Sequence, residues 1–358
     1  MLKGFLMGSA DIVPGVSGGT MALITGIYDR LIFAIKSINA KAVSHVLRFR
    51  IQLLFGQIHW KFFLFLGCGM VLAIIFFTRV VPLQIYMFTH PEIVYGLFFG
   101  LILGSIVLLI REIDTKERSW KNSFPLFGGA LFGFWVVNLV PGDTPETFWF
   151  VFLTGSVAIS AMVLPGLSGS YILLIFNKYD YILMQLSYLG THNTTEGILN
   201  LVPFILGMIV GIVAFSRLLS WLLKNYRTVT INVLIGFLLG SLYVIWPFQE
   251  RQYHETIINV EIMEVTNPVV EELMEHGAET NRPEYLRIAR VVERNGETQS
   301  VKIVEVETVS KKLISNKPFN PWSSEFLDLE HVRKRGGIIG MLIGLLMIIG
   351  ISYLRKKG

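Results

Sequence analysis

The stretch GFLMGSADIVPGVSGGTMALITGIYDR, residues 4–30, decides how the rest of the chain is interpreted. It is apolar enough to enter a membrane, but the sequence PGVSGG at residues 14–19 interrupts it. Proline removes a backbone donor and glycine is a poor helix former, so an unbroken helix is disfavoured here. A break at membrane depth is tolerated only where protein or a water-filled cavity covers the freed backbone groups. The stretch therefore predicts a broken, re-entrant segment.

The break also leaves hydrogen-bond donors at the expected start of the second half-helix. Exposed N–H groups and the positive end of the helix dipole favour an anion at such a position. Glycine lets an anion approach the backbone closely, and serine and threonine hydroxyls add further donors. The candidate anion-binding residues of this first motif are Ser17, Gly18, Gly19 and Thr20.

The same pattern returns later in the chain. Adding 151 to the residue numbers takes PGVSG at 14–18 to PGLSG at 165–169. The flanks match as far as a Tyr-Asp pair, at residues 28–29 and again at 179–180. One such motif is a weak signal, because a Pro/Gly kink often only helps helices to pack, but two copies in matching flanks indicate internal duplication. The second motif adds Ser168, Gly169 and Ser170 to the candidate anion-binding residues.

The composition predicts a polytopic membrane protein. Of the 358 residues, 53% are hydrophobic and 16% are charged, whereas soluble domains are nearer a quarter charged. Apolar runs long enough to span a bilayer recur along the chain. The net charge of +5 comes mostly from short loops, so it reports membrane orientation and does not indicate nucleic-acid binding. The sequence has no P-loop, paired cysteine or histidine cluster, and it predicts no catalytic residue, no metal and no cofactor.

The order of the apolar runs predicts an all-α polytopic membrane protein with two inverted repeats. Each repeat has a re-entrant broken-helix hairpin followed by two transmembrane helices. Because a single span separates the repeats, the second lies upside down relative to the first, as in many secondary transporters. The first repeat covers residues 1–110 (hairpin 1–36, spans 62–88 and 92–110), the linking span 124–140, the second repeat 148–247 (hairpin 148–187, spans 201–223 and 229–247) and the last span 338–354.

Residues 248–331 interrupt this plan with a charged segment that contains no spanning run. Strand-like alternation at 256–265 and 301–309 surrounds an expected helix at 268–276, so the segment predicts a small α+β insertion. Fold decoration is the plainer interpretation of this insertion, and a lid or a docking module for a partner is the alternative.

The distribution of lysine and arginine orients the chain. The segments rich in these residues fall on one side of the predicted topology, and loops poor in them fall on the other. Since basic loops stay in the cytoplasm, we expect the N- and C-termini there and the insertion 248–331 on the extracytoplasmic side. The basic segments are loops 37–60, 111–123 and 224–228 and the tail 355–357.

Three ionisable residues lie inside apolar runs. Such a side chain costs about 2.5–3.5 kcal/mol on insertion scales and marks a functional site by default. Asp11 is expected either to titrate and couple transport to an ion gradient, or to cap a half-helix. Arg79 and Arg217 occupy equivalent positions in the repeats, and a guanidinium fork suits a phosphate or a carboxylate. The alternative for both arginines is snorkelling to the headgroup layer.

The regions MGSADIVPGVSGGTMALITGIYDRLI and AISAMVLPGLSGSYILL resemble the signature halves of a bacterial membrane family, formerly a domain of unknown function. Members of that family are described as polyprenyl-phosphate (undecaprenyl-phosphate) transporters. The resemblance covers about residues 1–247 and 336–356. It implies return of the lipid carrier from the outer to the inner leaflet of the bacterial cytoplasmic membrane, for reuse in cell-wall synthesis. The positions it carries over are Asp11, Pro14 to Thr20 and Pro165 to Ser170, whereas the two arginines follow from symmetry.

The partners expected on this basis are a polyprenyl-phosphate lipid, the surrounding membrane and a coupling ion, H⁺ or Na⁺, with oligomers allowed. Three other functions stay open from the residues alone. They are transport of a small soluble anion, an enzyme acting on a lipid phosphate, and a non-transporting assembly factor that docks through residues 248–331.

Overall fold

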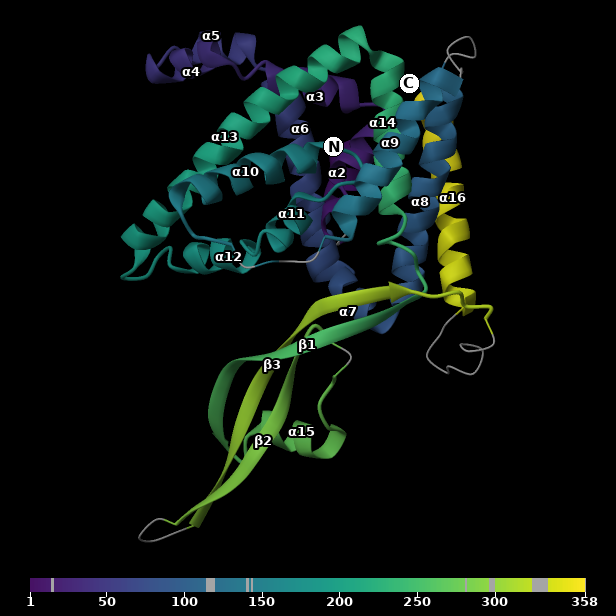
Figure 1. The fold of residues 1–358 in the computed structure, drawn as a ribbon. Helices are drawn as coiled ribbons and strands as arrows, with labels where there is room; N and C mark the ends of the chain where they lie inside the picture. The colour runs from purple at the N-terminus through teal and green to yellow at the C-terminus, as the bar shows by residue number, and fades with distance from the viewer. Residues whose placement is uncertain are drawn as a thin grey trace.

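The protein is described by a computed structural model in which a helical part carries a three-stranded sheet that projects from one end (Figure 1). The residues that the structure describes are 1–13, 16–113, 120–139, 142, 144–280, 282–295, 300–323 and 334–357.

The N-terminal half starts with short helices and ends with long ones. The chain breaks between the first two helices, at the first motif, and the second and third helices are bent by 118° relative to each other. The elements are α1 (Leu2–Asp11), α2 (Gly18–Ile24), α3 (Tyr28–Lys36), α4 (Ala40–Leu47), α5 (Ile51–Gln57), α6 (Trp60–Ile75), the π-helical turn η1 (Phe76–Val80), α7 (Leu83–Thr89) and α8 (Pro91–Glu112).

The second half repeats this order with fewer short helices. A helix again ends just before the motif, and a seven-residue helix follows it. The elements are α9 (Trp120–Val137), α10 (Phe148–Val163), α11 (Gly169–Ile175), α12 (Tyr179–Ser187), α13 (Thr194–Asn225), α14 (Arg227–Ser241) and, after the insertion, α16 (Lys334–Lys357).

Several of these helices are membrane-span candidates. Within the described ranges, four are long and apolar enough to cross a bilayer. The run expected at 62–88 is divided in the structure, because Pro82 cannot continue a helix and separates η1 from α7. The four candidates are Trp60–Val80, Pro91–Arg111, Thr194–Asn225 and Lys334–Ile351, and shorter apolar helices are Ser123–Val137, Phe148–Val163 and Arg227–Ser241.

Glycines bring helices together at matching positions in the two halves. A Cβ atom at Gly4 on α1 would overlap the carbonyl oxygen of Leu66 on α6. A Cβ atom at Gly155 on α10 would overlap the carbonyl oxygen of Phe204 on α13. Adding 151 to the number of the glycine and 138 to that of its neighbour converts the first pair into the second. Small residues of this kind allow close backbone approach between membrane helices. The reciprocal pairs are Gly69 with Met1 and Gly207 with Phe152.

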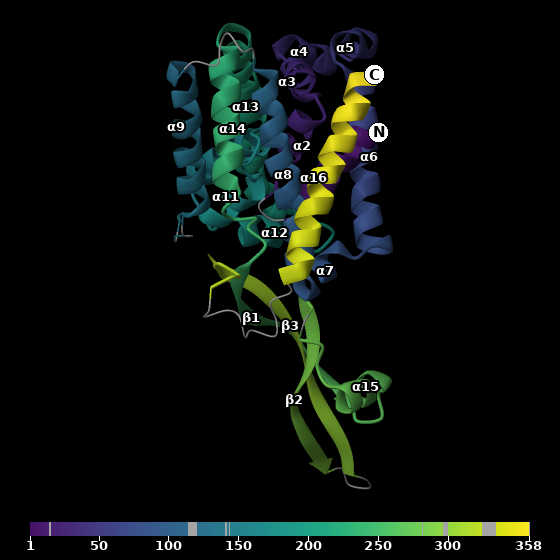
Figure 2. The same ribbon diagram turned by 90° about the vertical axis from the view of Figure 1, so that its right-hand side faces the viewer.

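Four of the long helices pack against one another in two pairs. Helix α8 packs along α16, and α9 packs along α14 (Figure 2). A Cβ atom at Gly100 would overlap the Met341 carbonyl oxygen, and one at Gly240 would lie 2.7 Å from the Ala130 carbonyl oxygen. Each half therefore supplies one glycine-bearing helix, and the chain returns after the insertion to cover α8.

The insertion is the small sheet with a helix that the sequence predicts. Its elements are β1 (Gln249–Glu264), α15 (Pro268–His276), β2 (Glu284–Asn295) and β3 (Ser300–Pro318). The strands are antiparallel in the order β1-β3-β2, and α15 covers one face through Val270, which packs with Val304 and Val306 of β3.

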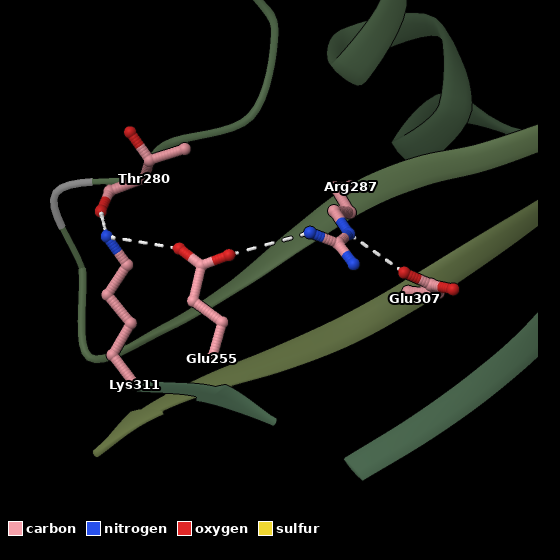
Figure 3. A network of polar contacts seen from close by, with 5 residues as sticks. All are labelled: Glu255, Thr280, Arg287, Glu307 and Lys311. Atoms are coloured by element: carbon pink, nitrogen blue, oxygen red, sulfur yellow. Dashed lines mark hydrogen bonds and ion pairs between the residues drawn. The ribbon is translucent and has the colours of Figure 1, made fainter. Parts of the chain in front are cut away.

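A network of charges ties the three strands together near the middle of the sheet (Figure 3). Arg287 of β2 donates from Nε to Glu307 of β3 at 2.8 Å, and its Nη1 lies 3.5 Å from Glu255 of β1. Glu255 also lies 3.6 Å from Nζ of Lys311, which donates to the Thr280 carbonyl oxygen at 2.6 Å. These contacts are partly exposed, so they fix the strand register more than they add stability.

The two ends of the helical part differ in what they carry. Figures 1 and 2 place α4, α5, the turn between α13 and α14 and the C-terminal end of α16 at the end away from the sheet. Helices α7 and α12 lie toward the end that carries the sheet. Basic segments thus gather opposite the insertion.

Candidate functional site

The first motif folds back on its own aspartate. The Oδ1 atom of Asp11, the last residue of α1, accepts a hydrogen bond from the N–H of Gly18, the first residue of α2, at 2.7 Å. A Cβ atom at Gly18 would lie 2.6 Å from Oδ2 of Asp11, so a side chain there would displace the carboxylate. The carboxylate therefore occupies the position at the helix start where the sequence predicts an anion. Pro14 and Gly15 of this motif lie outside the described residues.

The hydroxyl groups of the first motif join it to the second. Ser17 caps α2 by accepting from the Gly19 N–H at 3.1 Å, and it donates to the Leu164 carbonyl oxygen at 3.2 Å. Thr20 accepts from the N–H of Gly166 at 3.0 Å. Both side chains are almost completely buried, at 2% and 0% exposure. The two breaks, far apart in the sequence, thus meet inside the helical part.

Gly19 marks the closest approach of the two motifs. A Cβ atom at this position would lie 2.7 Å from the carbonyl oxygen of Val163, at the end of α10, and 3.2 Å from Oγ of Ser17. Neither neighbour is the end of a flexible side chain, because one is backbone and the other is held by two hydrogen bonds. The absence of a side chain at residue 19 is thus a packing requirement.

The second motif is more open. Ser168 caps α11 by accepting from the Tyr171 N–H at 3.4 Å, and its hydroxyl lies 2.8 Å from that of Ser170. Ser168 and Gly169 are half-buried and Ser170 is exposed. The position equivalent to Asp11 is Met162, which has no charge and is 41% exposed. A pair of neutral hydroxyls therefore faces accessible space where the first motif has a bound carboxylate.

The two arginines lie apart from the motifs, on the outer helices. Both are exposed, Arg79 in η1 and Arg217 in α13. Among the described residues neither arginine has a hydrogen bond or an ion pair, and the preceding Thr78 and Ser216 hydroxyls bond to their own helices. Since η1 leads into α7 near the sheet and Arg217 lies toward the α14 turn, the arginines approach opposite ends of the helical part (Figure 1).

Lys178 is a buried charge that the sequence analysis passed over. It is 1% exposed, donates from Nζ to the Thr144 carbonyl oxygen at 2.9 Å, and lies 5.7 Å from the ring centroids of Phe150 and Tyr181. A fully buried lysine is rare unless partnered. The sequence could have indicated this residue, because Lys178 stands in an apolar stretch at the position equivalent to Ile27 of the first half. Its contacts tie the connector before α10 to the turn after α11.

In the described part of the chain, no group of three or more His, Cys, Asp or Glu side chains is placed to hold a metal ion. The motif junction itself contains hydroxyl, backbone N–H and carboxylate groups, which form hydrogen bonds and pair with charges.

Comparison with known proteins identifies the family. Residues 7–261 match the family model described as undecaprenyl phosphate translocase-like. A polyprenyl-phosphate transporter of Vibrio cholerae is 39% identical over 249 residues, which are 70% of this chain and 77% of that protein. A polyprenyl-phosphate transporter of Staphylococcus aureus is 30% identical over 261 residues, covering 69% of this chain and 85% of that protein. No solved structure matches the chain.

The matched region contains both motifs, both arginines and every membrane-span candidate except α16. It ends within β1, so most of the insertion lies beyond it. With its apolar helices and transporter relatives, the protein is a multi-pass membrane protein. The chain belongs to the undecaprenyl phosphate translocase-like family.

Proposed function

We propose that this protein translocates polyprenyl phosphate, with undecaprenyl phosphate as the model substrate, from the outer to the inner leaflet of the bacterial cytoplasmic membrane. This movement returns the lipid carrier for reuse in cell-wall synthesis. Its relatives in two bacteria are named polyprenyl-phosphate transporters. The observation that carries the proposal is the meeting of the two motif breaks, beside which the hydroxyls of Ser168 and Ser170 stay accessible to a phosphate.

The architecture that we propose for this translocation is a pair of inverted repeats, each of which begins with a re-entrant hairpin. The matched glycine contacts of α1 with α6 and of α10 with α13 support a structural duplication. The basic segments at the end opposite the sheet support cytoplasmic termini and an extracytoplasmic insertion. Inverted repeats place the substrate site where they meet, near the middle of the membrane.

The phosphate head is proposed to bind on the open side of the junction, at Ser168, Gly169 and Ser170. The hydroxyls there donate to phosphate oxygens without competing with a carboxylate. Arg79 and Arg217, exposed near opposite ends of the helical part, attract the head from the outer and the inner leaflet. The isoprenoid tail stays in the lipid while the head crosses.

The first motif is proposed to be the gated side of the same site. Ser17, Gly18, Gly19 and Thr20 form its wall, and Asp11 holds the Gly18 N–H in this structure. A carboxylate in that place repels a phosphate. A proton on Asp11, or a sodium ion bound to it, would remove the repulsion and release the N–H for the phosphate. Entry of the ion from the outside would then couple the ion gradient to inward movement of the lipid head.

Proteoliposomes loaded with polyprenyl phosphate test this function. The readout is the rate at which phosphate heads on the far leaflet become accessible to an added reagent, with and without an imposed proton gradient. We expect rapid movement by the wild type, and loss of movement in Arg79→Ala and Arg217→Ala although both variants insert and purify normally. Full activity of both variants would refute the electrostatic part of the proposal.

Two parallel assays separate the proposal from its alternatives. Uptake of inorganic phosphate into the same liposomes, without lipid movement, would identify a transporter of soluble anions. Release of inorganic phosphate from the lipid by purified protein would identify an enzyme. We expect neither activity above that of empty liposomes.

A further inference from the structure

A second site lies where the insertion joins the helical part. A groove of about 620 Å³ opens between α8, the end of α14 and the segment that follows β3. Its lining is mostly aromatic, from Phe99, Tyr243, Trp246, Phe319 and Trp322. Pockets for small molecules are of about 300–1,000 Å³ and are lined mainly by apolar and aromatic side chains. The groove therefore has the size and the chemistry of a ligand site.

Specific contacts join the two walls of the groove. The indole Nε1 of Trp246 donates to the Phe319 carbonyl oxygen at 3.1 Å, and the Phe319 N–H donates to the Phe248 carbonyl oxygen at 3.0 Å. Phe99 packs edge to face against Trp246, with ring centroids 5.2 Å apart. Because these bonds satisfy the polar atoms within the protein, the rings are left to present apolar surface.

A cation with an unused donor lies beside this groove. The guanidinium carbon of Arg251, on β1, lies 4.2 Å from the ring centroid of Tyr95, one helical turn from Phe99 on α8. The Nη2 atom of Arg251 is buried and has no hydrogen-bond partner among the described residues. A buried guanidinium N–H without a partner is costly, so an anion that supplies an acceptor would be bound favourably there.

Glu92 adds a second unsatisfied group on the same stretch of α8. It lies three residues before Tyr95, and its Oε2 atom is buried without a partner in the described structure. A phosphate monoester has a second pKa of about 6 and retains a proton in part of its population near neutral pH. Its charged oxygens can accept from Arg251, and its remaining hydroxyl can donate to Glu92. A fully ionised diester lacks that hydroxyl.

From this juxtaposition we propose that the groove is a loading site for the lipid, in which the aromatic rings hold the first isoprenoid units and Arg251 holds the phosphate. The occupant has one charged end and an apolar chain, which matches a half-buried arginine with a buried, unpartnered nitrogen near an aromatic groove. The site lies at the sheet end, which is the outer leaflet in the proposed orientation. This inference rests on the proposed function, and it assigns the insertion a part in substrate capture.

The lining residues of the groove come from inside and outside the region matched by the family model. Phe99, Tyr243 and Trp246 lie within the region matched by the family model, whereas Phe319 and Trp322 lie beyond its end at residue 261. The insertion thus returns the chain across α14 to complete the groove. Relatives without an equivalent return would have only one wall of it.

Photocrosslinking tests the site directly. The probe is a polyprenyl phosphate with a diazirine in the isoprenoid units nearest the phosphate, added to the full-length protein in liposomes. We expect crosslinked peptides from residues 243–248 and 318–323, and their loss when unlabelled polyprenyl phosphate is in excess. If phosphatidylglycerol at the same concentration reduced probe crosslinking as much as polyprenyl phosphate does, the groove would be a general lipid site and the proposal would be overturned.

Transport kinetics supply the second measurement. Trp322→Ala, at a side chain that is 59% exposed, should raise the lipid concentration for half-maximal transport about three- to tenfold. Trp149→Ala removes an equally large and 70% exposed ring from α10 and serves as the matched control. Arg251→Met should weaken lipid binding while keeping most of the aliphatic contact. Equal kinetics for Trp322→Ala and Trp149→Ala, with no crosslinks in the groove, would refute the site.

The outcomes for the site and for the function can be told apart. Wild-type movement of polyprenyl phosphate without groove crosslinks would leave the proposed function standing and remove the loading site. Groove crosslinks specific to polyprenyl phosphate without any movement would remove the proposed function and retain the lipid site.

Discussion

The two motifs have nearly the same sequence but different surroundings. In the first motif, the carboxylate of Asp11 accepts a hydrogen bond from the start of the following helix. The hydroxyls of Ser17 and Thr20 form hydrogen bonds with the second motif. In the second, Met162 replaces the aspartate, and the Ser168 hydroxyl stays half-accessible. In the proposed account, the first motif is mainly a structural junction with a gated N–H, and the second motif is the side that binds the phosphate head.

The largest expected effect comes from closing the space between the motifs. Gly19→Ala would push a Cβ atom to 2.7 Å from the backbone oxygen of Val163, and overpacking of this kind costs about 1–3 kcal/mol. The equivalent residue of the second motif is Ser170, which is exposed, so Ser170→Ala should change the free energy of unfolding by less than about 0.5 kcal/mol. Thermal unfolding in detergent compares the two. Equal melting temperatures would show that the motifs do not pack as described.

The next largest loss of stability should come from removing the hydrogen bond between Gly166 and Thr20, which joins the two motifs. Thr20→Val keeps the side-chain shape but leaves the Gly166 N–H buried without an acceptor, at a cost of about 1–3 kcal/mol. The equivalent residue is Tyr171, whose hydroxyl donates to the Val137 carbonyl oxygen at 2.8 Å. Tyr171→Phe should cost only about 0.5–1.5 kcal/mol, because that site is partly open to solvent.

Thr20→Ser is the control for this pair of variants, since it retains the acceptor oxygen. Its melting temperature should stay close to that of the wild type. A Thr20→Val protein as stable as Thr20→Ser would contradict the assigned role of the hydroxyl.

Two substitutions of Asp11 should separate its capping role from its coupling role, with a smaller change in stability than the variants above. Asparagine caps helices about as well as aspartate, whereas alanine costs about 0.5–2 kcal/mol at such a position. Asp11→Asn should therefore keep the fold but lose the stimulation of lipid movement by a proton gradient, and Asp11→Ala should lose both. Proteoliposome assays with and without the gradient measure this. Gradient stimulation of normal size in Asp11→Asn would leave Asp11 as a cap only.

The reciprocal exchange sharpens the same comparison. Met162→Asp would place a carboxylate beside Gly169, as Asp11 lies beside Gly18. We expect this variant to fold, because residue 162 is exposed, and to move polyprenyl phosphate more slowly because the new charge repels the head. Transport at the wild-type rate would argue against a phosphate at the second motif.

Local chemistry made much of the fold predictable. The break before Gly18 follows from proline and glycine, and the helix expected at 268–276 is present as Pro268–His276. Strand-like alternation indicated parts of β1 and β3, whereas the strand β2 was not expected from the sequence. These features depend on residues close together in the sequence, which is why the chain alone indicates them.

Contacts between distant residues were not predictable. No local pattern indicates that Thr20 accepts from Gly166, that Lys178 reaches Thr144, or that Trp246 and Trp322 line one groove. The sequence placed Asp11 at a functional site and offered capping as an alternative role, and only the fold brings its carboxylate to Gly18.

The measurement that tests the central claim most directly is lipid movement by a double variant, Ser168→Ala with Ser170→Ala, beside the wild type in proteoliposomes. Hydrogen bonds to a charged group contribute about 1.5–3 kcal/mol each, so loss of both donors should slow the appearance of phosphate heads on the far leaflet about tenfold or more. The melting temperature should stay unchanged. Movement at the wild-type rate by the folded double variant would contradict the assignment of the phosphate head to the second motif.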